Sequence, residues 1–166
     1  ACNTSTAHAL AALREQSPVP VLGVIEPGAR AAVAATRGGP IGVIGTAGTI
    51  ASNAYPRAIH AISAALRVEQ VACPLLVPLV EEGWFEHPAT ALVAGEYLRP
   101  LIARRVDVLV LGCTHYPLLK PLLGQVMARR SGHASNVEFV KKLAAAEEET
   151  ASFNELPPAP REGITP

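Results

Sequence analysis

The chain has 166 residues, of which 49% are hydrophobic and 17% charged, and its 14 basic and 14 acidic residues give a formal net charge of +0. This length and hydrophobic content suit about one domain with a sizeable core and exclude a largely disordered chain. The balanced charge and the aromatic content of 4% give no sign of a nucleic-acid partner, because little in the composition would attract or stack on a polyanion.

Apolar runs and helical patterns alternate along the chain. Four short apolar runs predict buried strands over residues 19–25, 41–44, 69–73 and 106–111. Helical spacing, interrupted by prolines and glycines, predicts helices over residues 4–15, 27–36, 51–66, 87–105 and 117–127, with a loop or short helix over 74–82. This alternation predicts an α/β fold in which helices cover both faces of a parallel sheet.

The two ends of the chain differ from its middle. The chain begins with Ala-Cys-Asn-Thr rather than Met, on what reads as the end of an element, so we expect the first part of a longer protein to precede it. Beyond residue 128 a helical pattern over 136–151 gives way to a proline-rich stretch that reads as disordered.

The cysteine content and the hydropathy of the chain indicate in which cellular compartment the protein resides. Three cysteines without a Cys-x-x-Cys pair do not make a disulfide framework and fit a reducing cytoplasm. No apolar run reaches the roughly 18 residues of a membrane span, and no signal peptide is visible. We therefore expect a cytoplasmic protein without a membrane partner.

The most informative stretch is Gly-Cys-Thr-His-Tyr-Pro-Leu at residues 112–118, which follows the clearest predicted strand and precedes a helix. It places the Cys113 thiol and the His115 imidazole at a helix N-terminus, where free N–H groups and the helix dipole favour bound anions and thiolates. Cys2, followed by Asn-Thr, has similar chemistry. The turn Gly-Thr-Ala-Gly-Thr at residues 45–49 lacks the lysine of a phosphate loop and suits a carboxylate better.

Each of these patterns also has a purely structural interpretation. A cysteine at a strand end is more often structural than functional, and the glycines near residue 45 could serve close packing alone. Cys73 reads as a core thiol, Glu81 and Glu82 as a solvated pair, and Trp84 with Phe85 as a local packing cluster, a lid or a partner surface.

Two other chemistries use the same thiol. Zinc binding by Cys113, His115 and a further cysteine matches no common ligand spacing, so we expect no metal. A thiol hydrolase would need an asparagine or aspartate partner for His115, and the sequence shows none.

Residues 111–119, Leu-Gly-Cys-Thr-His-Tyr-Pro-Leu-Leu, resemble the second-cysteine signature of bacterial glutamate racemases, within the cofactor-independent aspartate/glutamate racemase family. Residues 1–4 resemble the first-cysteine signature. Blocks at 23–28, 41–50 and 73–83 match between them in the same order, so the resemblance covers residues 1 to about 127.

This resemblance implies two α/β domains with an active site between them and no cofactor. One cysteine thiolate removes the α-proton of glutamate while the other thiol protonates the opposite face. By resemblance, Cys2 deprotonates D-glutamate and Cys113 L-glutamate. The positions matched to substrate-holding or supporting residues are Asn3, Thr4, Thr114, His115 and, less surely assigned, Thr46 and Thr49.

Two parts of the family pattern are missing from the sequence: the initial Asp-Ser-Gly and Pro-Tyr-Gly loops, and a recognisable strand after Met127. We therefore expect residues 1–18 to be a remnant of the first domain, 19–128 the complete second domain and 129–166 a divergent tail. The chain alone should bind glutamate poorly and turn over little of it.

Two alternative functions and the oligomeric state stay open. The protein could be a related cysteine-pair racemase for an aspartate-like substrate, or a non-catalytic remnant that binds an anion. The family's role implies supply of D-glutamate for peptidoglycan. A homodimer is also left open.

Overall fold

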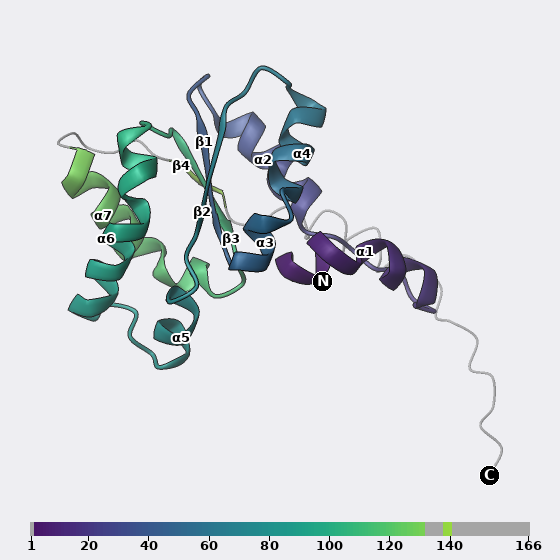
Figure 1. The fold of residues 1–166 in the computed structure, drawn as a ribbon, viewed down its shortest axis with the longest axis horizontal. Coiled ribbons are helices and arrows are strands. Elements are labelled where there is room, and N and C mark those ends of the chain that lie inside the picture. The colour runs from purple at the N-terminus through teal and green to yellow at the C-terminus, as the bar shows by residue number, and fades with distance from the viewer. Residues whose placement is uncertain (1, 132–137, 141–166) are drawn as a thin grey trace, which may run out of the picture.

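The computed structural model describes residues 2–131 and 138–140, and it is built on one parallel sheet (Figure 1). The sheet has four strands in the order β2-β1-β3-β4. Their bounds are β1 (Ile41–Gly45), β2 (Val68–Ala72), β3 (Val108–Gly112) and β4 (Glu138–Val140). All three strand pairings are parallel, as the alternation of elements predicted.

Helices cover both faces of this sheet. They are α1 (Asn3–Gln16), α2 (Ile25–Ala35), α3 (Ala47–Ala51), α4 (Ala54–Ile62), α5 (Leu76–Glu81), α6 (Pro88–Ala103), the 3-10 turn η1 (Tyr116–Leu119) and α7 (Lys120–Ser131). Figure 1 shows α2 and α4 on one side of the strands and α6 and α7 on the other. The α/β fold with helices on both faces is therefore confirmed.

The two central strands divide their side chains between two cores. Val43 and Val110 pack with α2 and α4, whereas Ile44 and Leu111 pack with α5, α6 and α7. Successive side chains of a strand point to opposite faces, so a strand covered on both sides reads as a continuous apolar run. All residues of β1 and β3 are buried, which is why hydropathy located both strands.

The strand predicted over residues 19–25 is wrong. Residues 20–23 have no regular structure, and Ile25 is the first residue of α2. The backbone here bonds to side chains of α1: the Thr6 hydroxyl accepts from Val24 N–H at 3.4 Å, and Arg14 Nε donates to the carbonyl of Val21 at 3.1 Å. This segment is thus hydrogen-bonded to α1 and does not join the sheet.

Two further boundaries differ from the prediction. The helix expected over 51–66 is shorter: α4 runs from Ala54 to Ile62, and Asn53, which takes a left-handed conformation at φ 52°, separates it from the preceding short helix α3. The helix expected from residue 136 is also wrong where it can be compared, since β4 pairs with β3 at 138–140. The rest of that helix and the proline-rich stretch lie outside the described residues. No helix within the described ranges has the length and apolarity needed to cross a bilayer.

Candidate active site

Three strands end level with one another at one edge of the sheet. The last residue of β1, Gly45, is in register with Ala72 of β2 and with Gly112 of β3. Thr46, Cys73 and Cys113 therefore leave the sheet side by side, at the carboxyl edge where ligands bind in open α/β sheets. These three strand ends therefore share one rim of the sheet.

Cys2 lies at the start of α1 and caps it. Its sulfur accepts a hydrogen bond from the backbone N–H of Ser5 at 3.4 Å and lies 3.2 Å from the Ser5 hydroxyl. The residue is exposed. Helix N–H groups directed at the sulfur favour a negative charge on it, so this position suits a reactive thiolate.

Three threonine hydroxyls from distant parts of the chain meet beside α1. Thr4 Oγ1 lies 3.0 Å from Thr46 Oγ1 and 3.2 Å from Thr49 Oγ1, and Thr46 donates to Thr49 at 3.1 Å. Thr46 also caps α3. A second contact between these two helices joins His8 Nε2 to the carbonyl of Gly48 at 3.0 Å. The cluster gathers hydroxyl donors of the kind that can hold a carboxylate.

Tyr55, which sequence reasoning missed, touches the neighbours of both cysteines. Its hydroxyl donates to Asn3 Oδ1 at 2.8 Å, next to Cys2 in the chain. Its ring lies so close to Gly112, next to Cys113, that a Cβ added there would be 3.3 Å from ring atom Cε2. Burial raises the pKa of the Tyr55 phenol, so the hydroxyl stays protonated and acts as a donor.

Cys113 belongs to a line of three groups. Its side chain is 6% exposed, and its sulfur lies 3.6 Å from His115 Nδ1. His115 Nε2 lies 3.1 Å from Glu81 Oε1 at the end of α5. A carboxylate has no proton to give, so Nε2 carries the proton and neutral Nδ1 can accept one from the thiol. The arrangement can take a proton from Cys113 and return it.

Glu81, expected with Glu82 to be solvated, is exposed and also contacts His115. Its side chain is 62% exposed, yet it orients the imidazole. Sequence spacing could not reveal this pair, because the two residues are 34 positions apart and come from different elements. Thr114 is exposed, and its hydroxyl lies 3.5 Å from the same His115 Nδ1.

Cys73 is a core thiol, as predicted. It is fully buried, and burial raises its pKa from 9.0 to about 12. Its carbonyl accepts a hydrogen bond from the Tyr116 hydroxyl at 2.7 Å. A thiol that stays neutral at physiological pH and is closed to solvent is unsuited to proton transfer with a substrate.

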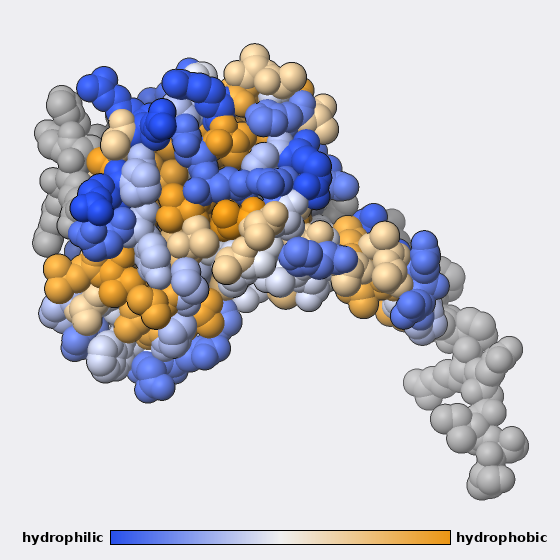
Figure 2. All heavy atoms as spheres, viewed as in Figure 1, coloured by the Kyte–Doolittle hydropathy of each residue, from blue (hydrophilic) through white to orange (hydrophobic). Residues whose placement is uncertain are grey.

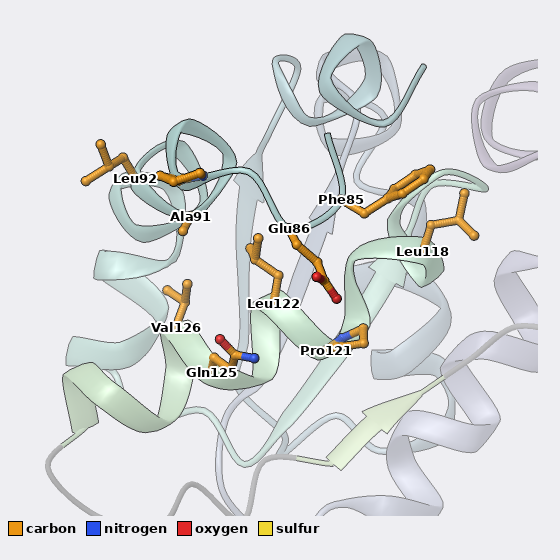
Figure 3. A pocket seen from close by; sticks show the side chains of 10 residues that line it. Phe85, Glu86, Ala91, Leu92, Leu118, Pro121, Leu122, Gln125 and Val126 are labelled. Carbon is orange, nitrogen blue, oxygen red and sulfur yellow. The ribbon is translucent and has the colours of Figure 1, made fainter. Parts of the chain in front are cut away.

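A groove lies away from these residues, between α6 and α7 (Figure 3). Its volume is about 700 Å³, and apart from Glu86 and Gln125 its labelled side chains are apolar. Apolar surface is also exposed around this side of the molecule (Figure 2), and Trp84 there stacks on His87 with ring centroids 4.2 Å apart. The groove contains none of the predicted site residues.

The described residues include no group of three or more histidine, cysteine, aspartate or glutamate side chains placed to hold a metal ion.

Comparison with known proteins gives one consistent family. The family model described as "Asp/Glu/Hydantoin racemase" matches residues 1–149. The chain is 60% identical over 126 residues to a glutamate racemase from Syntrophus aciditrophicus, covering 76% of this chain and 47% of that protein. It is 51% identical over 145 residues to one from Geobacter metallireducens, covering 87% and 54%.

Solved structures agree. A glutamate racemase from Bacillus anthracis (isoform RacE1) has a TM-score of 0.78 at 40% identity over 93% of this chain and 56% of that one. One from Francisella tularensis, in complex with D-glutamate, has a TM-score of 0.78 at 31% identity over 93% and 55%. The chain thus spans about half the length of the relatives it matches. With matches of this extent in sequence and fold, the chain belongs to the Asp/Glu/Hydantoin racemase family.

Proposed function

We propose that the whole protein is a glutamate racemase that interconverts L- and D-glutamate by proton transfer between two cysteines and the α-carbon. Cys2 deprotonates D-glutamate and Cys113 deprotonates L-glutamate. The observation that carries the proposal is the position of Tyr55, one buried side chain in contact with the neighbours of both cysteines. In a bacterial cytoplasm the product would supply D-glutamate for peptidoglycan.

The chemistry explains why hydroxyl and amide donors surround the thiols. An amino-acid α-proton is a very weak acid, and without a cofactor as electron sink the developing carbanion must be stabilised by donors aimed at the carboxylate. The three-threonine cluster, the Asn3 amide and Thr114 supply such donors. Two acids on opposite faces are needed, because each enantiomer loses its proton from a different side.

His115 and Glu81 support one of the two thiols. Nδ1 of His115 accepts the proton of Cys113 and leaves a thiolate that can attack the α-proton of L-glutamate. Glu81 holds the imidazole in the required tautomer. Thr46, Thr49, Thr4 and Asn3 then hold the substrate on the side of α1.

We also propose a division of the chain within the whole racemase. Residues 1–18 belong to the first domain, and 19–128 form the second, to which the tail from 129 onward adds β4. The substrate would bind between the domains, at the carboxyl edge of the sheet.

A different chemistry is a thiol hydrolase, because Glu81 supplies the acidic partner for His115 that the sequence did not show. Family membership and the second cysteine beside the threonine cluster favour the racemase. In a hydrolase Cys2 would be dispensable, whereas in the racemase its loss stops racemisation.

The test uses a chimera that supplies the missing half. In the Syntrophus aciditrophicus glutamate racemase, the region matched over 126 residues is replaced by the corresponding residues of this chain. Loss of the α-proton signal in deuterated water is then followed by NMR for both enantiomers of glutamate and aspartate. We expect exchange with glutamate, and a reduction by at least about a hundredfold in conversion to the opposite enantiomer in Cys2→Ala and in Cys113→Ala, because racemisation needs both thiols.

Cys73→Ala is the matched control, since this thiol lies in the core and should leave exchange near that of the unmodified chimera. Exchange with aspartate alone would favour the aspartate-like racemase. A folded chimera without exchange on any substrate would contradict an enzyme and favour the anion-binding remnant.

A further inference from the structure

Only one of the two polar atoms of the Asn3 side-chain amide has a hydrogen-bond partner among the described residues. The residue is 2% exposed, and its Oδ1 accepts a hydrogen bond from Tyr55 at 2.8 Å. Its Nδ2 is buried and has no hydrogen-bond partner among the described residues. A buried amide that lacks an acceptor for its two N–H groups destabilises the fold, so an acceptor is expected in the complete site.

Tyr55 determines which end of this amide is left without a partner. The Tyr55 side chain is fully buried and burial raises its pKa, so its O–H keeps the proton and needs an acceptor. Asn3 Oδ1 is that acceptor. Rotating the amide by half a turn would place Nδ2 against the hydroxyl, leave the O–H of Tyr55 without an acceptor and expose a carbonyl oxygen in place of the NH₂ group.

The ring of Tyr55 is itself fixed. Added Cβ atoms at Gly28 and at Gly112 would lie 3.2 Å and 3.3 Å from atoms of this ring, so both backbones lie against it. The hydroxyl therefore has a defined position relative to the strand that carries Cys113 as well as to the helix that carries Cys2.

We propose that Tyr55 is a positioning residue whose hydroxyl fixes the Asn3 amide with its NH₂ group directed to a carboxylate oxygen of the substrate. This inference rests on the proposed racemase function. A carboxylate accepts from this NH₂ group, whereas the rotated amide would present an oxygen and repel it. Tyr55 thereby determines that Asn3, beside Cys2, presents its NH₂ group and not its oxygen to the substrate. Tyr55 itself does not contact the substrate.

The first test observes the amide directly in the 166-residue chain. The NMR signals of the Asn3 NH₂ group are identified as the pair lost in Asn3→Ala. Tyr55→Phe keeps the ring and removes only the hydroxyl, so the pair should shift and broaden as the amide loses its single orientation. Tyr97→Phe is the matched control, because the Tyr97 hydroxyl bonds to Leu75 N–H at 3.4 Å and not to Asn3. An unchanged Asn3 pair in Tyr55→Phe would overturn the proposal.

The second test measures substrate binding in the chimera by a double-mutant cycle. Tyr55→Phe and Asn3→Ala should each raise KM for glutamate about tenfold and lower kcat less, because Asn3→Ala removes a charge-assisted hydrogen bond to the carboxylate and Tyr55→Phe releases the amide from the orientation that makes this bond. The double variant should be no worse than Asn3→Ala. Effects of the two substitutions that multiply, or an unchanged KM in Tyr55→Phe, would show that Tyr55 does not act through Asn3 and would overturn the proposal.

The two tests separate this proposal from the proposed function. A folded chimera without exchange would refute the racemase and with it the substrate role of the amide, whatever the NMR signals show. An active chimera with the expected Cys113→Ala loss but an unchanged KM in Tyr55→Phe would refute only the role of Tyr55.

Discussion

At the scale of single residues, the three cysteine thiols are chemically identical but lie in different environments. Cys2 is exposed at a helix N-terminus, Cys113 is nearly buried beside an imidazole, and Cys73 is enclosed in the core. Burial raises the pKa of Cys73 to about 12. The first two positions suit proton exchange with a ligand, and the third suits packing.

The raised pKa of Cys73 makes stability depend on pH in the alkaline range. Below pH 9, near its unperturbed pKa of 9.0, the thiol is protonated in both the folded and unfolded states. Between pH 9 and about 12 only the unfolded chain ionises, so the free energy of unfolding falls as pH rises. Urea unfolding at pH 8, 10 and 11 should show this decline, and Cys73→Ala should show a shallower one. A stability that rises over this range would contradict the account.

Glu81 should matter for activity and little for stability. Its carboxylate is 62% exposed, so the ion pair with His115 contributes below about 1 kcal/mol to folding. Glu81→Gln replaces a carboxylate that can only accept by an amide whose NH₂ group can donate to Nε2, so Nδ1 is no longer kept free for Cys113. We expect racemisation by the chimera to fall at least about tenfold, equally in both directions because the enantiomers have equal free energy. Glu82→Gln is the matched control, and an equal loss there would contradict a specific role.

At the scale of elements, hydropathy predicted those strands that both cores bury. β1 and β3 are uniformly buried and were found from their apolar runs, whereas residues 19–25 have the same composition and form no strand. Val19 is 59% exposed and residues 21–24 are only half-buried, so an apolar run does not by itself show that a segment is buried in a sheet. The site roles of Glu81 and Tyr55 were not predicted for another reason: both roles arise from contacts between elements that are far apart in the sequence.

The strand end that carries Cys113 depends on close approach of two backbones. A Cβ at Gly112 would lie 2.6 Å from the carbonyl oxygen of Ile44, which is closer than atoms can approach. Gly112→Ala should therefore destabilise the chain by roughly 1–3 kcal/mol in urea unfolding. Gly48→Ala is the control, because its nearest contact would be an ordinary 3.4 Å. Equal stability of the two variants would contradict so close an approach of β1 and β3.

At the scale of the whole molecule, the chain spans about half the length of its relatives. It carries both predicted cysteines, but the resemblance assigns further substrate contacts to a segment that it lacks. Racemisation by the 166-residue chain alone should therefore be at least about a hundredfold slower than by the chimera, measured by the same exchange assay. A near-normal rate for the isolated chain would contradict this expectation.

The central claim is that Cys2 and Cys113 act on one carbon atom from opposite sides. The most direct measurement is a crystal structure of the chimera with D-glutamate bound. The account predicts both sulfur atoms about 3–4 Å from the α-carbon, on opposite faces, with the carboxylate beside the threonine cluster. A glutamate that contacts only one of the two sulfurs, or cysteines that open into separate cavities, would contradict it.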